Sequence, residues 1–132
     1  MIVVDTSIVI AIIKDEPEAA TFVDILDDSQ MTIMSVVSYV EAHMVTNDRR
    51  LRTQATDVDN VLAAAGIEIV DVTRDQAGLA VSAFLAYGKG RNRARLNLAD
   101  CFSYALAKSR GAPLLFKGDD FSRTDIVPAW RP

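Results

Sequence analysis

Four short apolar runs alternate with longer segments of helical spacing, and this alternation is the strongest constraint on the fold. The runs are rich in β-branched residues and cover residues 2–4, 32–36, 67–72 and 113–116. Apolar residues recur at helical spacing over residues 8–14, 17–27, 39–47, 53–65, 74–87 and 98–109. Strands that alternate with helices form right-handed crossovers and a parallel sheet that is covered on both faces. We therefore predict an α/β fold with a parallel sheet of four to five strands between helices.

Polar residues at the ends of these segments support the predicted helix boundaries. Thr73 with Gln76, and Ser38 with Glu41, have the spacing of capping boxes, and Asn97 is a typical N-cap residue. A glycine follows three of the predicted helices, which is typical of a helix end.

The size of the chain indicates one domain spanning residues 1–132, with half of its residues hydrophobic. One cysteine and one histidine exclude an intrachain disulfide and a zinc site, and favour a reducing compartment. The first 13 residues are apolar, but they contain an aspartate, lack a basic start and fall short of the roughly 20 residues of a membrane span. We therefore expect a cytoplasmic protein without a membrane segment.

Asp5 interrupts the most apolar stretch of the sequence. An isolated buried carboxylate costs several kcal/mol or becomes protonated, so it needs a partner. That partner is either the start of the following helix, which Asp5 would cap, or a cation.

Further acidic residues follow the ends of the other predicted strands. These are Glu41, Asp100, Asp119 and Asp120. Helices that return to a parallel strand begin at the carboxyl edge of the sheet, so we expect all of these acids to share one rim with Asp5. Each acid alone has a structural explanation, as a helix cap or a turn residue.

The acids as a group are harder to explain by capping. Two carboxylates about 4 Å apart repel by about 4 kcal/mol at an effective dielectric constant of about 20. No Lys, Arg or His is adjacent in sequence to Asp5, Glu41 or Asp100. A cluster of oxygen ligands suits a hard divalent cation, so the sequence predicts a site for Mg²⁺, with Mn²⁺ as a substitute.

The net charge of −4 argues against general attraction to nucleic acid, but one segment is basic. Four of the seven residues at positions 89–95 are cationic: Lys89, Arg91, Arg93 and Arg95. A solvated surface loop is one interpretation of this segment. We favour contact with the phosphates of a nucleic acid, because the segment directly precedes Asp100 and its neighbours.

Four motifs spread over the chain carry a family resemblance. They are Val-Val-Asp-Thr-Ser at 3–7, residues 35–41 ending in Glu41, Leu-Asn-Leu-Ala-Asp-Cys-Phe-Ser-Tyr-Ala at 96–105, and Leu-Leu-Phe-Lys-Gly-Asp-Asp-Phe at 114–121 with Thr-Asp-Ile at 124–126. With these motifs the chain resembles the PIN-domain ribonucleases, and specifically the VapC toxins of bacterial type II toxin–antitoxin pairs. Many relatives carry an acid three residues before the closing Phe, where this chain has Gly118, so Asp119 and Asp120 are both candidates for the fourth acid.

The resemblance implies a single PIN-like domain and metal-dependent endonucleolytic cleavage of RNA, with tRNA among the candidate substrates. Asp5 and Asp100 would be the principal metal ligands, and Glu41 with Asp119 or Asp120 would complete the site.

Neighbouring polar residues receive supporting roles. Thr6, Ser7 and Asn97 would orient a carboxylate or a water, with helix capping as the equally good alternative. Lys117 would touch the scissile phosphate.

The resemblance also implies protein partners. A VapB-type antitoxin would hold the toxin inactive by placing a helix in an apolar groove and a Lys or Arg in the acidic pocket. We also expect a homodimer, with a twofold interface on the apolar surface of residues 36–45, and a higher assembly with the antitoxin.

Two other functions compete with this prediction. A receiver-like phospho-acceptor domain also uses acids at strand ends, Mg²⁺ and a Lys after its last strand, but the chain lacks the adjacent carboxylates expected after the first strand. A non-catalytic PIN module that only binds RNA or protein is the second alternative. The presence of an acid at all four positions argues against it.

Overall fold

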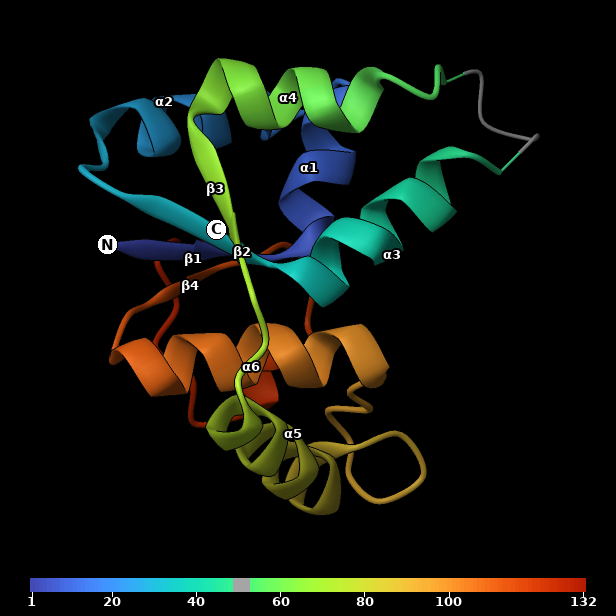
Figure 1. The fold of residues 1–132 in the computed structure, drawn as a ribbon, viewed down its shortest axis with the longest axis vertical. Coiled ribbons are helices and arrows are strands. Elements are labelled where there is room, and N and C mark those ends of the chain that lie inside the picture. Colours follow the sequence, from blue (N-terminus) through green and yellow to red (C-terminus); the bar gives the residue numbers. More distant parts are fainter. Residues whose placement is uncertain (49–52) are drawn as a thin grey trace.

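A parallel sheet in the order β3-β2-β1-β4 lies at the centre of the fold (Figure 1). The computed structural model describes residues 1–48 and 53–132. Its strands are β1 (Ile2–Val4), β2 (Thr32–Ser35), β3 (Ile67–Val70) and β4 (Leu114–Leu115). All three strand pairs are parallel. The predicted α/β class and its four strands are therefore confirmed.

The C-terminal segment extends the sheet at the β4 edge. The Leu114 N–H donates to the Val127 carbonyl at 2.9 Å, and the Ala129 N–H donates to the Leu114 carbonyl at 2.8 Å. These bonds make one parallel bridge rather than a fifth full strand. Trp130 follows and packs edge-on against Phe22, with ring centroids 5.1 Å apart.

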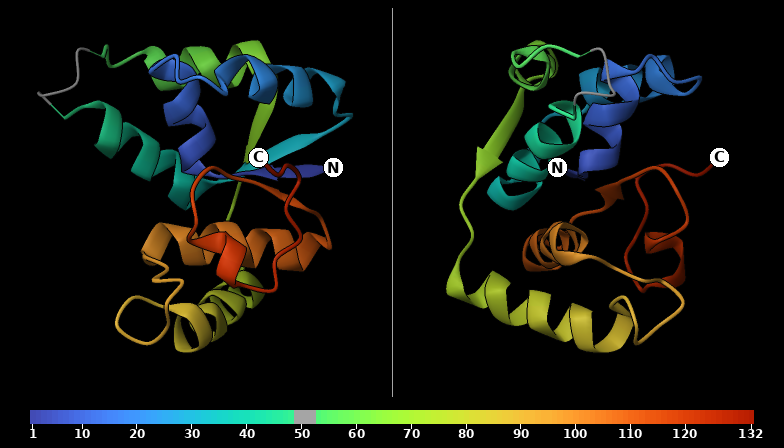
Figure 2. Two further views of the ribbon diagram at one scale, coloured as in Figure 1. Left: turned by 180° about the vertical axis from the view of Figure 1, so that it is seen from behind. Right: turned by 90° about the vertical axis from the view of Figure 1, so that its right-hand side faces the viewer.

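Helices cover both faces of the sheet. They are α1 (Thr6–Ile13), α2 (Ala19–Asp28), α3 (Val36–Thr46), α4 (Asp57–Ala65), α5 (Arg74–Tyr87) and α6 (Leu98–Arg110), followed by a short 3₁₀ turn at Phe121–Arg123. Figures 1 and 2 show α1, α2 and α4 on one face and α5 with α6 on the other. Helix α3 continues from β2 and contacts both α1 and α6. None of the described helices is long and apolar enough to span a membrane.

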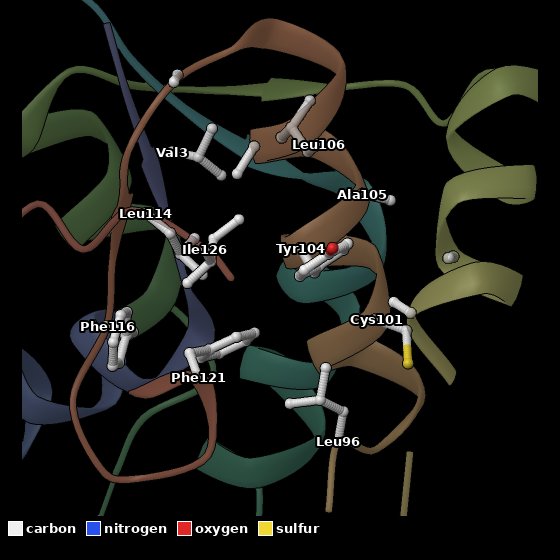
Figure 3. Packing of buried hydrophobic residues seen from close by; sticks show 14 of the residues in the cluster. Val3, Leu96, Cys101, Tyr104, Ala105, Leu106, Leu114, Phe116, Phe121 and Ile126 are labelled. Carbon is white, nitrogen blue, oxygen red and sulfur yellow. The ribbon is translucent and has the colours of Figure 1, made fainter. Parts of the chain in front are cut away.

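Alternate strand residues supply two separate hydrophobic cores. Val3 and Leu114 pack with α5 and α6, where Tyr104 belongs to the same cluster (Figure 3). Val4 and Leu115 pack with α1, α2 and α4. Because both faces of β1, β2 and β4 are buried, these strands appear in the sequence as mostly apolar runs, whereas the edge strand β3 exposes Glu68 and Ile69.

Two predicted helix starts differ from the structure by more than two residues. Helix α4 begins at Asp57, four residues later than expected. Helix α3 begins at Val36, three residues earlier than expected, because the Ser35 hydroxyl accepts a hydrogen bond from the Val37 N–H at 3.2 Å and so caps the helix. The predicted capping box of Ser38 with Glu41 is therefore wrong, and Glu41 lies in the second turn rather than the first.

The remaining cap predictions are largely confirmed. Thr73 accepts from the Gln76 N–H at 3.1 Å and caps α5. The return bond of that box is missing, since the Gln76 amide oxygen is buried with no partner among the described residues. Gly111 ends α6 with a φ of 59°, a left-handed conformation that suits glycine.

Candidate active site

Asp5 lies where β1 ends and α1 begins, and three hydrogen bonds hold its carboxylate. Oδ2 accepts from the Ser7 N–H at 3.0 Å and from the Ser7 hydroxyl at 2.7 Å. Oδ1 accepts from the Ser103 hydroxyl of α6 at 2.8 Å. The side chain caps α1, and only 5% of the residue is exposed. Asp5 therefore caps α1 and also lies at the carboxyl edge of the sheet, as predicted.

Asp100 lies in the first turn of α6 and forms a complete capping box with Asn97. The Asn97 side-chain oxygen accepts from the Asp100 N–H at 2.9 Å, and Asp100 Oδ2 accepts from the Asn97 N–H at 3.0 Å. Burial raises the pKa of Asp100 to about 7, and the Asp5 carboxylate adds to this effect. Weaker contributions come from Glu41 and Asp120, and the backbone bond from Asn97 opposes the shift. The charged groups that raise this pKa are therefore all carboxylates.

Glu41 faces the same site from α3. The Asn97 amide donates to Glu41 Oε2 at a long 3.5 Å, so Asn97 touches two of the acids. Burial raises the pKa of Glu41, and the charge of Asp5 raises it further, while hydrogen bonds from Thr6 and Asn97 oppose both effects. Asp5, Glu41 and Asp100 thus lie close enough for their charges to interact, although they come from three different parts of the chain.

The two candidates for the fourth acid have different surroundings. Both are exposed, in the turn that follows β4 and Gly118. Asp120 lies close enough to raise the pKa of Asp100. Asp119 lines a cavity of about 510 Å³ on the side of the C-terminal segment, together with Lys117 and Trp130.

The donor set fits a hard cation held by few protein ligands. No three His, Cys, Asp or Glu side chains within residues 1–48 and 53–132 are grouped closely enough to hold one ion together. Magnesium does not need such a cage, because it keeps several waters and binds one or two carboxylates. Two buried carboxylates that raise each other's free energy, with a third half-buried acid beside them, suit that mode of binding.

Comparisons with known proteins identify the family to which this four-stranded fold belongs. The family model of the PIN domain matches residues 2–127. Ribonuclease VapC30 of Mycobacterium tuberculosis is 44% identical over 130 residues, which are 98% of this chain and 99% of that protein. Ribonuclease VapC of Mycolicibacterium smegmatis is 45% identical over 125 residues, which are 95% and 97% of the two chains. The chain belongs to the VapC ribonucleases, a family of PIN-domain toxins.

Solved structures share the fold at lower identity. VapC20 of Mycobacterium tuberculosis, described as a sarcin–ricin loop cleaving toxin, has a TM-score of 0.76 with 19% identity and full coverage of both chains. VapBC2 of Rickettsia felis, bound to a DNA fragment from its promoter, has a TM-score of 0.73 with 15% identity, over 97% and 96% of the two chains. Membership of the PIN family removes the receiver-like alternative.

The basic segment of this PIN domain forms a closed loop between α5 and α6 (Figure 2). The Leu96 N–H donates to the Tyr87 carbonyl at 2.9 Å, and the Lys89 N–H donates to the Leu96 carbonyl at 3.0 Å, so the base of the loop is fixed. The four cationic residues of the loop are exposed and line an open surface cavity of about 580 Å³. The guanidinium of Arg91 lies 5.2 Å from the centre of the Phe84 ring.

Lys117 has a different environment from the one expected for a phosphate-binding residue. Its ammonium contacts Glu16 and lies 2.8 Å from Glu18 Oε2, in the loop between α1 and α2. Its backbone N–H donates to the Ser7 hydroxyl at 3.0 Å. The backbone of Lys117 therefore supports the site through Ser7, while its side chain is engaged elsewhere.

Sequence reasoning placed Thr6 and Ser7 beside the first acid but missed two buried serines. Ser7 binds Asp5 as predicted, whereas the Thr6 hydroxyl donates to the Ser38 carbonyl at 3.1 Å and joins α1 to α3. Ser103 contacts Asp5, and Ser38 contacts Ser103. The sequence does contain an indication of this role. Ser38 lies three residues from Glu41 and Ser103 lies three residues from Asp100, so each serine is on the same helix face as an acid.

Proposed function

We propose that this VapC ribonuclease is a metal-dependent endoribonuclease in which Asp5 and Asp100 hold Mg²⁺, with Glu41 and Asp120 beside the ion. Mn²⁺ would substitute. The observation that carries the proposal is the burial of Asp100 near the buried carboxylate of Asp5, with Glu41 and Asp120 also close enough for their charges to raise the pKa of Asp100. An acidic cluster of this kind is costly without a counter-ion, and a divalent cation offsets that cost.

A bound cation would lower the pKa of a water and neutralise charge on the phosphate. The residues of the chain would do the rest. Asp5 is held in one orientation by Ser7 and Ser103. Asp100 must lose its proton before it can act as a ligand. Glu41, whose pKa is also raised by burial, would accept a proton at its carboxylate.

Asp120 is our choice for the fourth acid, because its charge acts on Asp100. Asp119 is the weaker candidate. It is adjacent to Asp120 in sequence, but it lines the cavity beside Trp130. Thr6 and Asn97 would act indirectly, Thr6 by tying α1 to α3 and Asn97 by holding Asp100 and Glu41.

RNA would be held beside the acidic site rather than in it. The exposed side chains of Lys89, Arg91, Arg93 and Arg95 lie on the loop that leads into Asn97, and we propose that they bind phosphates. Lys117 would join them only after leaving Glu16 and Glu18. Structured RNA such as tRNA is a candidate substrate.

The partner that we propose is a VapB-type antitoxin. An apolar cavity of about 860 Å³ lies between α3 and the start of α6, and Glu41 and Asn97 form its polar end. Met44 and Leu98 in this cavity are each 73% exposed, an unusual exposure for large apolar residues. An apolar helix of the antitoxin would cover them, and a basic side chain next to it would reach the acids. The homodimer that we also propose would use the same apolar surface of α3, where Val40, Met44 and Val45 are exposed.

The test is cleavage of total bacterial RNA by the purified chain, freed of antitoxin, with Mg²⁺, with Mn²⁺ and with EDTA. We expect discrete fragments that require the metal and that Asp5→Asn and Asp100→Asn do not produce. Cleavage that survives either substitution in the folded protein would contradict the metal site. A folded protein that binds RNA but never cleaves it would support the non-catalytic alternative.

A further inference from the structure

Two buried serines connect the elements that carry the acids. Ser38 of α3 and Ser103 of α6 are both fully buried, at 0% exposure. Their hydroxyl oxygens are 2.9 Å apart, and the Ser103 hydroxyl is 2.8 Å from Asp5 Oδ1. The result is a chain of hydrogen bonds from Ser38 through Ser103 to Asp5, which joins α3 and α6 to the end of β1.

Chemistry fixes the direction of this chain. An ionised carboxylate can only accept hydrogen bonds, so the single hydroxyl hydrogen of Ser103 is committed to Asp5. The contact between the two serines therefore requires Ser38 to donate and Ser103 to accept. A donor that is itself hydrogen-bonded in this way is polarised and binds the carboxylate more strongly.

The spacing of the serines relates them to the other acids. Ser38 precedes Glu41 by three residues, and Ser103 follows Asp100 by three residues. Residues three apart lie on one face of a helix, so each helix presents a hydroxyl and a carboxylate on the same face. The contact between the two serines thus sets the separation of α3 and α6 one turn away from Glu41 and Asp100.

The hydrogen bonds on Asp5 also distinguish its two oxygens. Each carboxylate oxygen offers about two acceptor positions. Oδ2 accepts two hydrogen bonds from Ser7, whereas Oδ1 accepts one, from Ser103. Oδ1 is therefore the oxygen with acceptor capacity left for a cation, and Ser103 determines how that oxygen is directed.

We propose that Ser38 and Ser103 are positioning residues for the metal site: the chain of hydroxyls orients Asp5 Oδ1 for the cation and holds α3 and α6 in register. This inference rests on the proposed function, because it concerns the same site. A purely structural role would make the serines matter for stability alone.

The experiment compares wild type, Ser103→Ala, Ser38→Ala and the double variant in Mn²⁺ titrations, followed by the electron paramagnetic resonance signal of the free ion. We expect Ser103→Ala to weaken Mn²⁺ binding by about 10-fold, the size typical of losing a group that orients a metal ligand. Ser38→Ala should weaken binding less. The double variant should match Ser103→Ala, because Ser38 acts only through Ser103. In cleavage assays kcat should fall while KM for RNA stays unchanged.

Ser35→Ala is the matched control. It removes another buried serine hydroxyl, at the end of β2, which caps α3 by accepting a hydrogen bond from the Val37 N–H. We expect this variant to melt at a lower temperature in EDTA but to bind Mn²⁺ like wild type. If Ser103→Ala does not fold, Ser38→Ala tests the same chain from its other end.

The outcomes separate the two levels of the proposal. Wild-type Mn²⁺ affinity in folded Ser103→Ala and Ser38→Ala, with loss of thermal stability alone, would overturn the positioning role and leave the metal site intact. Equal Mn²⁺ binding by wild type and Asp5→Asn would overturn the metal site itself, and the positioning role with it.

Discussion

Asn97 and Asp100 exchange two hydrogen bonds across the first turn of α6, at 2.9 Å and 3.0 Å, while the Asn97 amide reaches Glu41 on α3 at 3.5 Å. One side chain thus caps a helix and contacts two of the acids proposed for catalysis. The start of α6 cannot unravel without moving the site.

Asn97→Ala should therefore affect stability and activity together. The lost cap costs about 1 kcal/mol, which lowers the melting temperature by several degrees. We expect cleavage to fall more than this loss of stability explains, because Asp100 and Glu41 lose a common neighbour. Thr73→Ala removes the cap of α5, away from the acids, and should lower only the melting temperature. Equal losses of activity in the two variants would argue against a role for Asn97 in the site.

The metal-free protein should lose stability as the pH rises. The pKa of Asp100 is about 7 in the folded protein and 3.8 in the reference state, so between these values the folded state binds more protons than the unfolded state. By linkage the free energy of unfolding then falls with increasing pH, by at most about 4 kcal/mol over this window.

Urea unfolding in EDTA at pH 5 and pH 8 measures this effect. Asp100→Asn removes the titrating group, so its stability should change less between the two pH values, and it should be more stable than wild type at pH 8. Mg²⁺ should bind wild type more tightly as the pH rises through 7, because ligation displaces the proton. Identical pH dependence in the two proteins would show that Asp100 titrates normally.

Asp119→Asn and Asp120→Asn should have different effects. Of these two acids, only Asp120 contributes to the raised pKa of Asp100, whereas Asp119 lines the cavity beside the C-terminal segment. We expect Asp120→Asn to lower kcat by about 10-fold or more and Asp119→Asn to have little effect. The opposite order would assign the fourth acid to Asp119, and the cavity would then belong to the site.

Neutralising the basic loop should weaken RNA binding without changing the chemistry. Arg91→Gln with Arg93→Gln removes two exposed cations, so KM should rise, kcat should stay near wild type and the salt dependence of binding should become less steep by about two phosphate contacts. Arg110→Gln, at the other end of α6, is the matched control. If both proteins lose affinity equally, the loop has no special part in RNA binding.

Much of the fold follows from patterns that are local in sequence. Strands β1, β2 and β4 could be predicted because both of their faces are buried, and both boundaries of α5 could be predicted because Thr73 and Gly88 mark them. The start of α3 was not predicted, because Val36 and Val37 are β-branched and continue the appearance of β2.

The acids on the rim could be predicted from strand ends, but their supporting contacts could not. Ser38 and Ser103 are 65 residues apart, and Lys117 meets Glu16 and Glu18 about a hundred residues away along the chain. Two residues of a capping box and two residues on one face of a helix can both be three positions apart. Ser38 and Glu41 were therefore interpreted as a capping box, although they share a helix face. Only the tertiary structure distinguishes the two.

Asp5 caps α1 and is also a proposed metal ligand, and this combination has a genetic consequence. Asparagine caps helices about as well as aspartate, so Asp5→Asn can keep the hydrogen bonds from Ser7 that start α1, while it loses the charge and replaces the oxygen that accepts from Ser103 with an amide NH2. A single base change converts an aspartate codon to an asparagine codon. Under the proposed mechanism, cells under selection to escape the toxin would therefore have a short route to a protein that folds and keeps its apolar surface but does not cut RNA.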